Sequence, residues 1–173
     1  MVRRTRIGFL AATAAVSLTA LAISACGGSG SAATAPPTTA SGKAATVGLA
    51  DEGNLGKILV DSQSRSLYLF QKDVGTKSAC TGACAAAWPP LRATGQPVVG
   101  TALSASKVGT TARSDGKPQV TYNGHPLYLY SADQKPGDTN GQGLNAFGGG
   151  WFALSAAGNM VSGTGTNGGA SGY

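Results

Sequence analysis

Short apolar stretches separated by turn residues recur from position 58 to position 161, and such runs are typical of β-strands. The pattern predicts strands at 58–60, 67–70, 108–113, 119–122, 127–130 and 151–154, with a further short one at 158–161. Turn sequences separate them. Asn123-Gly124 is the clearest, because both central residues of a tight hairpin turn need a positive φ. The segment 80–87 is the one stretch that predicts a helix, of one or two turns.

Side chains two residues apart in a strand share a face, so Tyr68 and Phe70 point one way while Leu67 and Leu69 point the other. The same alternation holds for 127–130, which reads Leu-Tyr-Leu-Tyr. Because both faces of both stretches are apolar, we expect these strands to be covered on both sides.

The chain carries the same pattern twice. LYLFQKD at 67–73 returns as LYLYSAD at 127–133, an offset of 60 residues, and Val120 lies at the same offset from Val60. Beyond the aspartates the offset becomes 63, and the matched pairs are Trp88 with Trp151, Leu91 with Leu154, Gly95 with Gly158, and Val98 with Val161. Two copies of one unit of about 40 residues predict a pseudo-twofold pair of supersecondary units.

The strands and the duplication together predict an all-β fold. We expect a small compact sandwich or distorted barrel built from two pseudo-symmetric hairpin-based repeats, with at most one short helix. The first repeat covers about 58–98 and the second about 118–161, within a folded domain at 51–161. A domain of about 110 residues buries nearly two-thirds of its unfolded surface, which suffices for one hydrophobic core.

The first residues have the composition of a bacterial export signal. Three arginines stand within the first six positions, and 7–25 carry no charge and are rich in Ala, Leu, Ile and Val. The segment ends Ile23-Ser24-Ala25-Cys26, which resembles the lipobox of bacterial lipoproteins. Residues 1–25 are therefore predicted to be a lipoprotein signal peptide, with lipid (diacylglycerol, palmitate) attached at Cys26. The alternative is a plain transmembrane anchor, because 19 uncharged residues are about enough to span a bilayer.

The residues on either side of the predicted domain contain few large apolar side chains. Residues 26–50 are mostly Gly, Ser, Ala, Thr and Pro and predict a flexible tether, and 162–173 predict a disordered tail. Once the signal is removed, ten basic residues face seven acidic ones, and the basic residues are scattered singly. A nucleic-acid partner is not expected, because it needs a clustered basic patch.

Cys80 and Cys84 are the two cysteines that remain beside Cys26. An even pair in an exported protein predicts a disulfide, which in so short a loop contributes about 2 kcal/mol. A metal or redox pair is the alternative, but the spacing differs from that of Cys-x-x-Cys motifs. His125, the only histidine, follows the Asn-Gly turn with no nucleophile beside it. We expect it to be a surface turn residue, and we expect no metal site and no catalytic residue.

Asp73 and Asp133 directly follow the two repeated strands, where a carboxylate can accept hydrogen bonds from backbone N–H groups of the next loop. The paired aromatic residues of the two copies either build the core or line a site for an apolar or quinone-like ligand. We favour the core, because a residue that folding requires is expected in both copies. No cofactor is expected in either case.

The pattern Tyr-x-aromatic-x-x-Asp followed by a tryptophan segment, written twice behind a lipobox, resembles the family of predicted bacterial lipoproteins known as the secreted repeat of unknown function. The matching residues are Tyr68, Phe70, Asp73, Trp88, Tyr128, Tyr130, Asp133 and Trp151. The resemblance implies a protein that lipid anchors to the outer face of the cell membrane, and some relatives are associated with alkane use. It implies no mechanism.

We therefore expect a non-enzymatic, structural or binding role in the cell envelope. The membrane is the expected partner through Cys26, and the sequence does not identify a protein or small-molecule partner. The alternative is an extracytoplasmic binding module for a small hydrophobic or redox-active ligand. An enzyme is disfavoured by a thin inventory of acid–base groups, with seven acidic residues, one histidine and two cysteines predicted to be oxidised.

Overall fold

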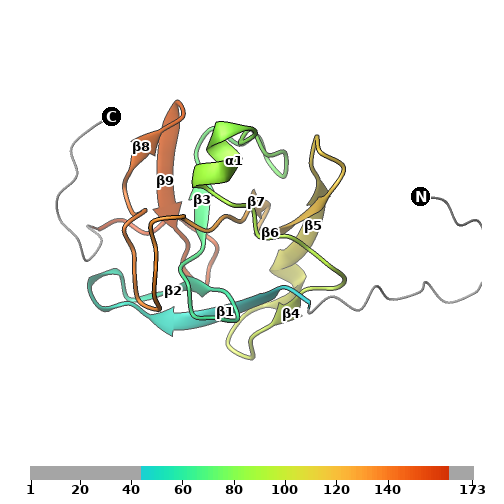
Figure 1. Ribbon diagram of the computed structural model, residues 1–173. Coiled ribbons are helices and arrows are strands. Elements are labelled where there is room, and N and C mark those ends of the chain that lie inside the picture. Colours follow the sequence, from blue (N-terminus) through green and yellow to red (C-terminus); the bar gives the residue numbers. More distant parts are fainter. Residues whose placement is uncertain (1–43, 164–173) are drawn as a thin grey trace, which may run out of the picture. The chain divides into compact units, whose positions relative to one another are not determined.

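The structure, a computed structural model, describes residues 44–163, and most regular elements within them are strands (Figure 1). The strands are β1 (Thr46–Asp51), β2 (Lys57–Val60), β3 (Tyr68–Phe70), β4 (Val98–Val99), β5 (Val108–Ala112), β6 (Pro118–Tyr122), β7 (His125–Pro126), β8 (Asn145–Ala146) and β9 (Gly149–Ala153). The described part also contains one α-helix, α1 (Ala83–Ala87), and two 3-10 turns, η1 (Gly53–Leu55) and η2 (Ala105–Lys107). The all-β prediction is confirmed, and the single α-helix lies in the segment predicted to hold it.

The strands form three small sheets, ordered β2-β1-β4, β3-β9-β8 and β5-β6-β7. Every pairing in them is antiparallel except that of β1 with β4. Asn123 and Gly124 turn the chain between β6 and β7 with φ values of 49° and 83°, as the hairpin prediction requires.

The predicted start of the folded domain at residue 51 is wrong. Residues Thr46–Asp51 form β1, which pairs with β2 and β4, and Val47 is fully buried. The signal in the sequence is weak because small residues separate the two large apolar ones of this strand. Residues 1–43 and 164–173 lie outside the described residues, and with them the predicted signal peptide, Cys26, most of the predicted tether and most of the predicted tail.

The strand predicted at 127–130 forms isolated bridges instead of a regular ladder. Tyr128 bridges to Tyr68 on one side and to Pro90 on the other. Leu129 N donates to Pro89 O, but Pro89 has no backbone N–H to return the bond, so the ladder cannot continue past it. The segment nevertheless keeps an extended course beside β3.

Each copy of the repeat pairs its tyrosine strand with the tryptophan segment of the other copy. In one direction, β3 of the first copy pairs with β9 of the second, with Tyr68 opposite Ala153 and Phe70 opposite Trp151. In the other direction, residues 127–129 and 89–91 exchange two hydrogen bonds of 2.8 Å. Neither copy completes its own pairing, so the two copies are intertwined.

The pseudo-twofold axis passes between Tyr68 and Tyr128. Their backbones exchange two hydrogen bonds, from Tyr68 N to Tyr128 O at 2.8 Å and from Tyr128 N to Tyr68 O at 2.9 Å. Such an exchange occurs between directly opposite residues of antiparallel strands. The two copies therefore meet at the same position of the repeated sequence.

The alignment of Val60 with Val120 is wrong by one residue. Leu59 N donates to Leu154 O and Val120 N donates to Leu91 O, both at 2.8 Å, so Leu59 is the structural counterpart of Val120. The hairpin ahead of β3 is one residue longer than its counterpart in the second copy. A comparison of residue identities alone favours the match of Val60 with Val120, because both are valine.

Two hydrophobic clusters lie on the two faces of the repeated strands. The aromatic side includes Ile58, Val60, Tyr68, Phe70, Cys80, Cys84, Trp88, Tyr128 and Trp151. The leucine side includes Val47, Leu59, Leu67, Leu69, Leu91, Val120, Tyr122, Leu127 and Leu154. The prediction that both faces are covered is confirmed, and each cluster takes residues from both copies.

The intertwined arrangement makes a prediction about separated halves. Residues 44–100 and 101–163, produced as two chains, each lack the segment that pairs with their tyrosine strand, so neither should fold as a monomer. Mixed in equal amounts, they should assemble into a heterodimer that restores the near-ultraviolet circular dichroism of the intact domain. Size-exclusion chromatography and spectra of each half, alone and mixed, measure this. A half that is folded and monomeric on its own would contradict the exchange of segments.

Candidate functional site

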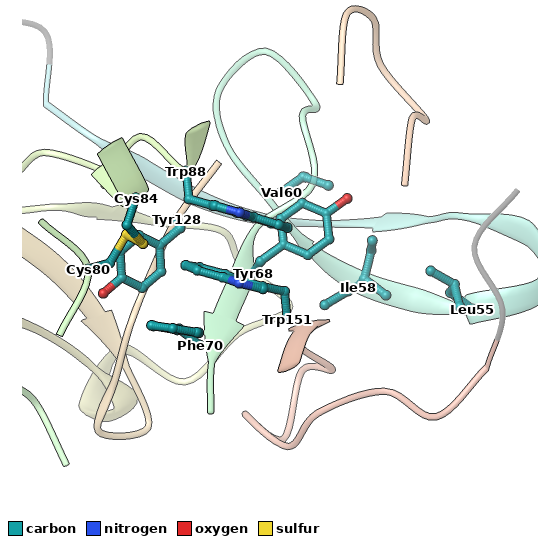
Figure 2. Packing of buried hydrophobic residues seen from close by; sticks show 11 residues of the cluster. Leu55, Ile58, Val60, Tyr68, Phe70, Cys80, Cys84, Trp88, Tyr128 and Trp151 are labelled. Carbon is teal, nitrogen blue, oxygen red and sulfur yellow. A yellow bond between two sulfur atoms is a disulfide. The ribbon is translucent and has the colours of Figure 1, made fainter. Parts of the chain in front are cut away.

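Four aromatic rings stack face to face through the middle of the domain. The centroid distances are 4.0 Å from Phe70 to Trp151, 3.9 Å from Trp151 to Trp88, and 4.2 Å from Trp88 to Tyr130. Figure 2 shows the rings of Phe70, Trp151 and Trp88 lying parallel to one another. The inner two rings are matched residues of the repeat, and so are the outer two, so the stack follows the pseudo-twofold symmetry.

Two further rings meet the stack edge-on. Tyr68 contacts Trp88 at a centroid distance of 5.4 Å, and Tyr128 contacts Trp151 in the same way at 5.2 Å. All four residues are buried. Offset and edge-to-face contacts of this kind contribute about 0.5–1.5 kcal/mol each beyond the burial of area. The direct contact of the rings leaves no space for a planar ligand between the two copies.

A glycine is required where the loop of the second copy crosses the rings. A Cβ atom at Gly141 would lie 2.8 Å from Trp88 Cη2 and 2.9 Å from Tyr68 Cζ, which is closer than side-chain carbons approach. The Gly-rich loop between Asp133 and Trp151 therefore packs its backbone directly against the aromatic stack.

The two tyrosines of the motif donate hydrogen bonds to the aspartates of the opposite copy. Tyr68 Oη donates to Asp133 Oδ2 at 2.6 Å, and Tyr128 Oη donates to Asp73 Oδ2 at 2.8 Å. These reciprocal bonds, called the tyrosine–aspartate links below, were not foreseen in the sequence. The available signal is the constant spacing of tyrosine and aspartate in both copies, which suggests a shared role but does not say which copy serves which.

The second oxygen of each aspartate has the role predicted for it. Asp73 Oδ1 accepts a hydrogen bond from Ala79 N at 2.7 Å, and Asp133 Oδ1 accepts one from Asn140 N at 3.0 Å. Each carboxylate thus joins the loop that follows its own strand to the tyrosine of the other copy. Hydrogen bonds to a charged group stabilise by about 1.5–3 kcal/mol.

Burial dominates the electrostatics of these links. It raises the pKa of Asp73 and of Asp133 above the ordinary carboxyl value, although the hydrogen bonds that each carboxylate accepts lower it in part. The pKa of the Tyr68 phenol and that of the Tyr128 phenol are raised, first by burial and also by the neighbouring carboxylate. Both phenols therefore stay protonated and keep donating well above neutral pH.

The disulfide between Cys80 and Cys84 is confirmed, with Cα atoms 5.2 Å apart. Both cysteines are buried, and Figure 2 shows the bridge beside the ring of Tyr128. The matched loop of the second copy contains no cysteine. The bridge therefore stiffens one loop of one copy and is not an element that both copies need.

A buried arginine also belongs to one side of the symmetric core. Arg113 Nη1 donates to Ser78 Oγ and to Gln119 Oε1, both at 2.6 Å, and Nη2 donates to the carbonyl oxygen of Cys80. Ser78 Oγ in turn lies 2.7 Å from Tyr128 Oη. The link around Asp73 is thus supported by a cation and a disulfide.

An open pocket of about 380 Å³ lies beside Asp73. It is lined by Leu69, Phe70, Gln71, Asp73, His125, Asn159 and Met160. His125, expected as a surface turn residue, is half-buried on β7 and forms part of this lining. The pocket combines an apolar floor with a carboxyl, an imidazole, two amides and a thioether, so it offers several kinds of polar contact to a small ligand.

Side chains that commonly ligate metals are scattered over residues 44–163. No three His, Cys, Asp or Glu side chains gather there in a group that could hold a metal ion. Over the same residues, no helix is both long enough and apolar enough to cross a bilayer.

The sequence matches the family described as a secreted repeat of unknown function twice, over residues 50–92 and over residues 109–155. The two matches overlap the two intertwined copies and identify a class of secreted proteins that contain this repeat. They cover more than half of the chain, so the protein belongs to this family. The resemblance that the motif indicated is confirmed. No curated protein and no solved structure matches the chain.

The tyrosine–aspartate links predict a pattern of energetic coupling. Tyr68→Phe and Asp133→Ala should each destabilise the domain by about 1.5–3 kcal/mol, because a buried partner loses a charged hydrogen bond. In double-mutant cycles, Tyr68 with Asp133 and Tyr128 with Asp73 should show coupling of about 0.5–3 kcal/mol. The matched controls are the pairs within one copy, Tyr68 with Asp73 and Tyr128 with Asp133, which should be nearly additive. Urea unfolding measures all of them, and equal coupling within and between copies would exclude the links.

Alkaline pH should weaken the domain through the same phenols. A phenol whose pKa is raised by folding contributes stability that is present below its unfolded pKa of about 10 and is lost as pH rises beyond it, by about 1.4 kcal/mol per pH unit. The Tyr68→Phe/Tyr128→Phe variant should therefore lose less stability than the wild type between pH 9 and pH 11. The measurement is urea unfolding at both pH values. An equal loss in both proteins would show that these phenols do not carry the alkaline transition.

Proposed function

We propose that the protein is a lipoprotein anchored by Cys26 to the outer face of the cell membrane, where it serves a non-enzymatic, structural or binding role. The observation that carries this proposal is the use of the family's motif. In both copies the tyrosine, the second aromatic residue, the aspartate and the tryptophan hold the two copies together. Because the motif residues build the core, the family motif marks a structural scaffold. The function is then carried by residues on the exposed surface of that scaffold.

The chemistry of the described residues supports a role without catalysis. The carboxylates of Asp73 and Asp133 each accept two hydrogen bonds from the fold. Cys80 and Cys84 are oxidised and buried, so they present no thiolate nucleophile. A nucleophile within hydrogen-bond reach of a base is the usual mark of covalent catalysis, and these groups do not supply one.

The lipid anchor is tested at its attachment residue. In the exported protein, Cys26 should be the first residue and should carry acyl chains, because Ile23-Ser24-Ala25 precedes it as a lipobox does. Cys26→Ala should leave the precursor uncleaved by the lipoprotein peptidase and without the added lipid mass. Intact-mass spectrometry and Triton X-114 partition of both proteins measure this, with Cys80→Ser as the control that should remain lipidated. A mature N-terminus elsewhere, without acyl chains, would refute the proposal.

A second candidate function is favoured by the pocket beside Asp73. A pocket of about 380 Å³ is large enough for a small molecule, and its lining mixes Leu69 and Phe70 with polar groups. The protein would then act as an extracytoplasmic binding module. Gln71, His125 and Asn159 in the lining do not suit an alkane, because a hydrocarbon would leave their polar groups desolvated without partners.

A further inference from the structure

The only histidine of the chain and its only methionine other than Met1 line the same pocket. His125 comes from β7, and Met160 comes from the segment that follows β9. Each of these two residue types occurs once in residues 44–163, and both residues are among the seven that line the pocket. Neither His125 nor Met160 belongs to the aromatic cluster, although Phe70 of that cluster also lines the pocket.

Direct contacts hold the two walls of this pocket together. The turn that leads to Met160 is fastened to the hairpin that carries His125, because Tyr122 Oη donates a hydrogen bond of 2.8 Å to Ala156 O. Lys107 Nζ donates a second one, of 2.6 Å, to the next carbonyl of the same turn. The separation of the walls is therefore set by the fold.

Gln71 contacts the methionine within the pocket. Its Nε2 group donates to Met160 Sδ at 3.8 Å. His125 belongs to the same lining. The imidazole of His125 and the thioether of Met160 therefore face one pocket together with Gln71.

The ligand types select the ion. A thioether is a soft ligand that favours Cu(I), and imidazole is a good ligand for copper, whereas oxygen-rich sites suit magnesium and calcium. Met160 keeps 48% of its surface exposed, so the residue can be reached from solvent. Asp73 lines the same pocket, where a carboxylate can orient a metal-bound imidazole from outside the coordination sphere.

We propose that the pocket binds one Cu(I) ion through the imidazole of His125 and the thioether of Met160. The inference deepens the second candidate function, on which it rests, by naming the class of ligand. Coordination requires no change of oxidation state in the protein, since the cysteines remain paired as a disulfide.

The symmetry of the fold supports placing the proposed copper site in the second copy only. The position matched to His125 is Arg65, which forms an ion pair with Asp61 at 2.6 Å, and the position matched to Met160 is Pro97. The matched positions of the first copy therefore carry neither proposed ligand. Residues that hold the core are duplicated, and the proposed ligands are not.

The test uses the exported protein purified from the membrane in detergent, with the disulfide intact. Cu(I), kept reduced by ascorbate without oxygen, is titrated in competition with a chromophoric Cu(I) chelator. One ion should bind per chain. His125→Gln and Met160→Leu should each weaken binding at least about tenfold, in line with the loss of a ligand or its support. X-ray absorption should show a sulfur neighbour of copper that disappears in Met160→Leu.

Two controls separate the site from general effects. Leucine conserves the volume of methionine, so Met160→Leu should keep the thermal melting of the wild type. The variant Met160→Leu/Val98→Met restores the thioether on β4, at a position that is 53% exposed and is not part of the pocket lining, and it should not restore copper binding. Alkylation without reductant should find no free thiol at Cys80 or Cys84.

Equal Cu(I) affinity in the wild type, His125→Gln and Met160→Leu would overturn the copper assignment. If Cu(I) does not bind but an organic molecule is extracted from the wild type and lost in His125→Gln, the copper assignment fails and the binding-module function stands. If neither Cu(I) nor an extracted molecule depends on His125 or Met160, both the assignment and the binding-module function fail.

Discussion

The structure depends on one constraint: the buried tyrosine phenol of each copy finds its hydrogen-bond acceptor in the aspartate of the other copy. The two links, at 2.6 Å and 2.8 Å, run in opposite directions across the pseudo-twofold axis. Each aspartate also holds the loop after its own strand. Sheet pairing, loop position and the union of the copies are therefore coupled, and Trp88 and Trp151 stack where the exchanged segments of the two copies meet.

The symmetric core and the asymmetric surface have different physical roles. Stacked rings and buried carboxylates need the same geometry on both sides of the axis, so both copies supply the same residues. The loops between aspartate and tryptophan are free to differ. One is closed by a disulfide next to Arg113, and the other packs Gly141 on the rings. The pocket with His125 and Met160 lies on the side where the symmetry is broken.

Much of the fold follows from the sequence because it depends on local patterns. The alternation of leucine with aromatic residues at 67–70 predicts two covered faces, and the two hydrophobic clusters lie on those faces. The aspartates at the strand ends predict the bonds to Ala79 and Asn140. The disulfide follows from an even pair of cysteines in an exported chain.

What the sequence does not predict depends on contacts between distant residues. Tyr68 and Asp73 stand in one copy, and nothing in their order reveals that the partner of Tyr68 is 65 residues away. The strand β1 has too few large side chains to signal burial, and only its pairing with β2 and β4 stabilises it. His125 and Met160 are separate single residues in the sequence, and the turn after β9 brings them to one pocket.

The exchange of segments has a consequence for how this protein can evolve. A change at Tyr68 is felt at Asp133, so its compensation must arise in the opposite repeat and not beside it. After the duplication neither repeat can be lost or evolve as an independent domain, because deleting one repeat removes half of the core that the other repeat needs. Natural selection therefore acts on the two repeats as a single heritable unit, and novelty can accumulate only in the loops and surfaces that the symmetry leaves unmatched.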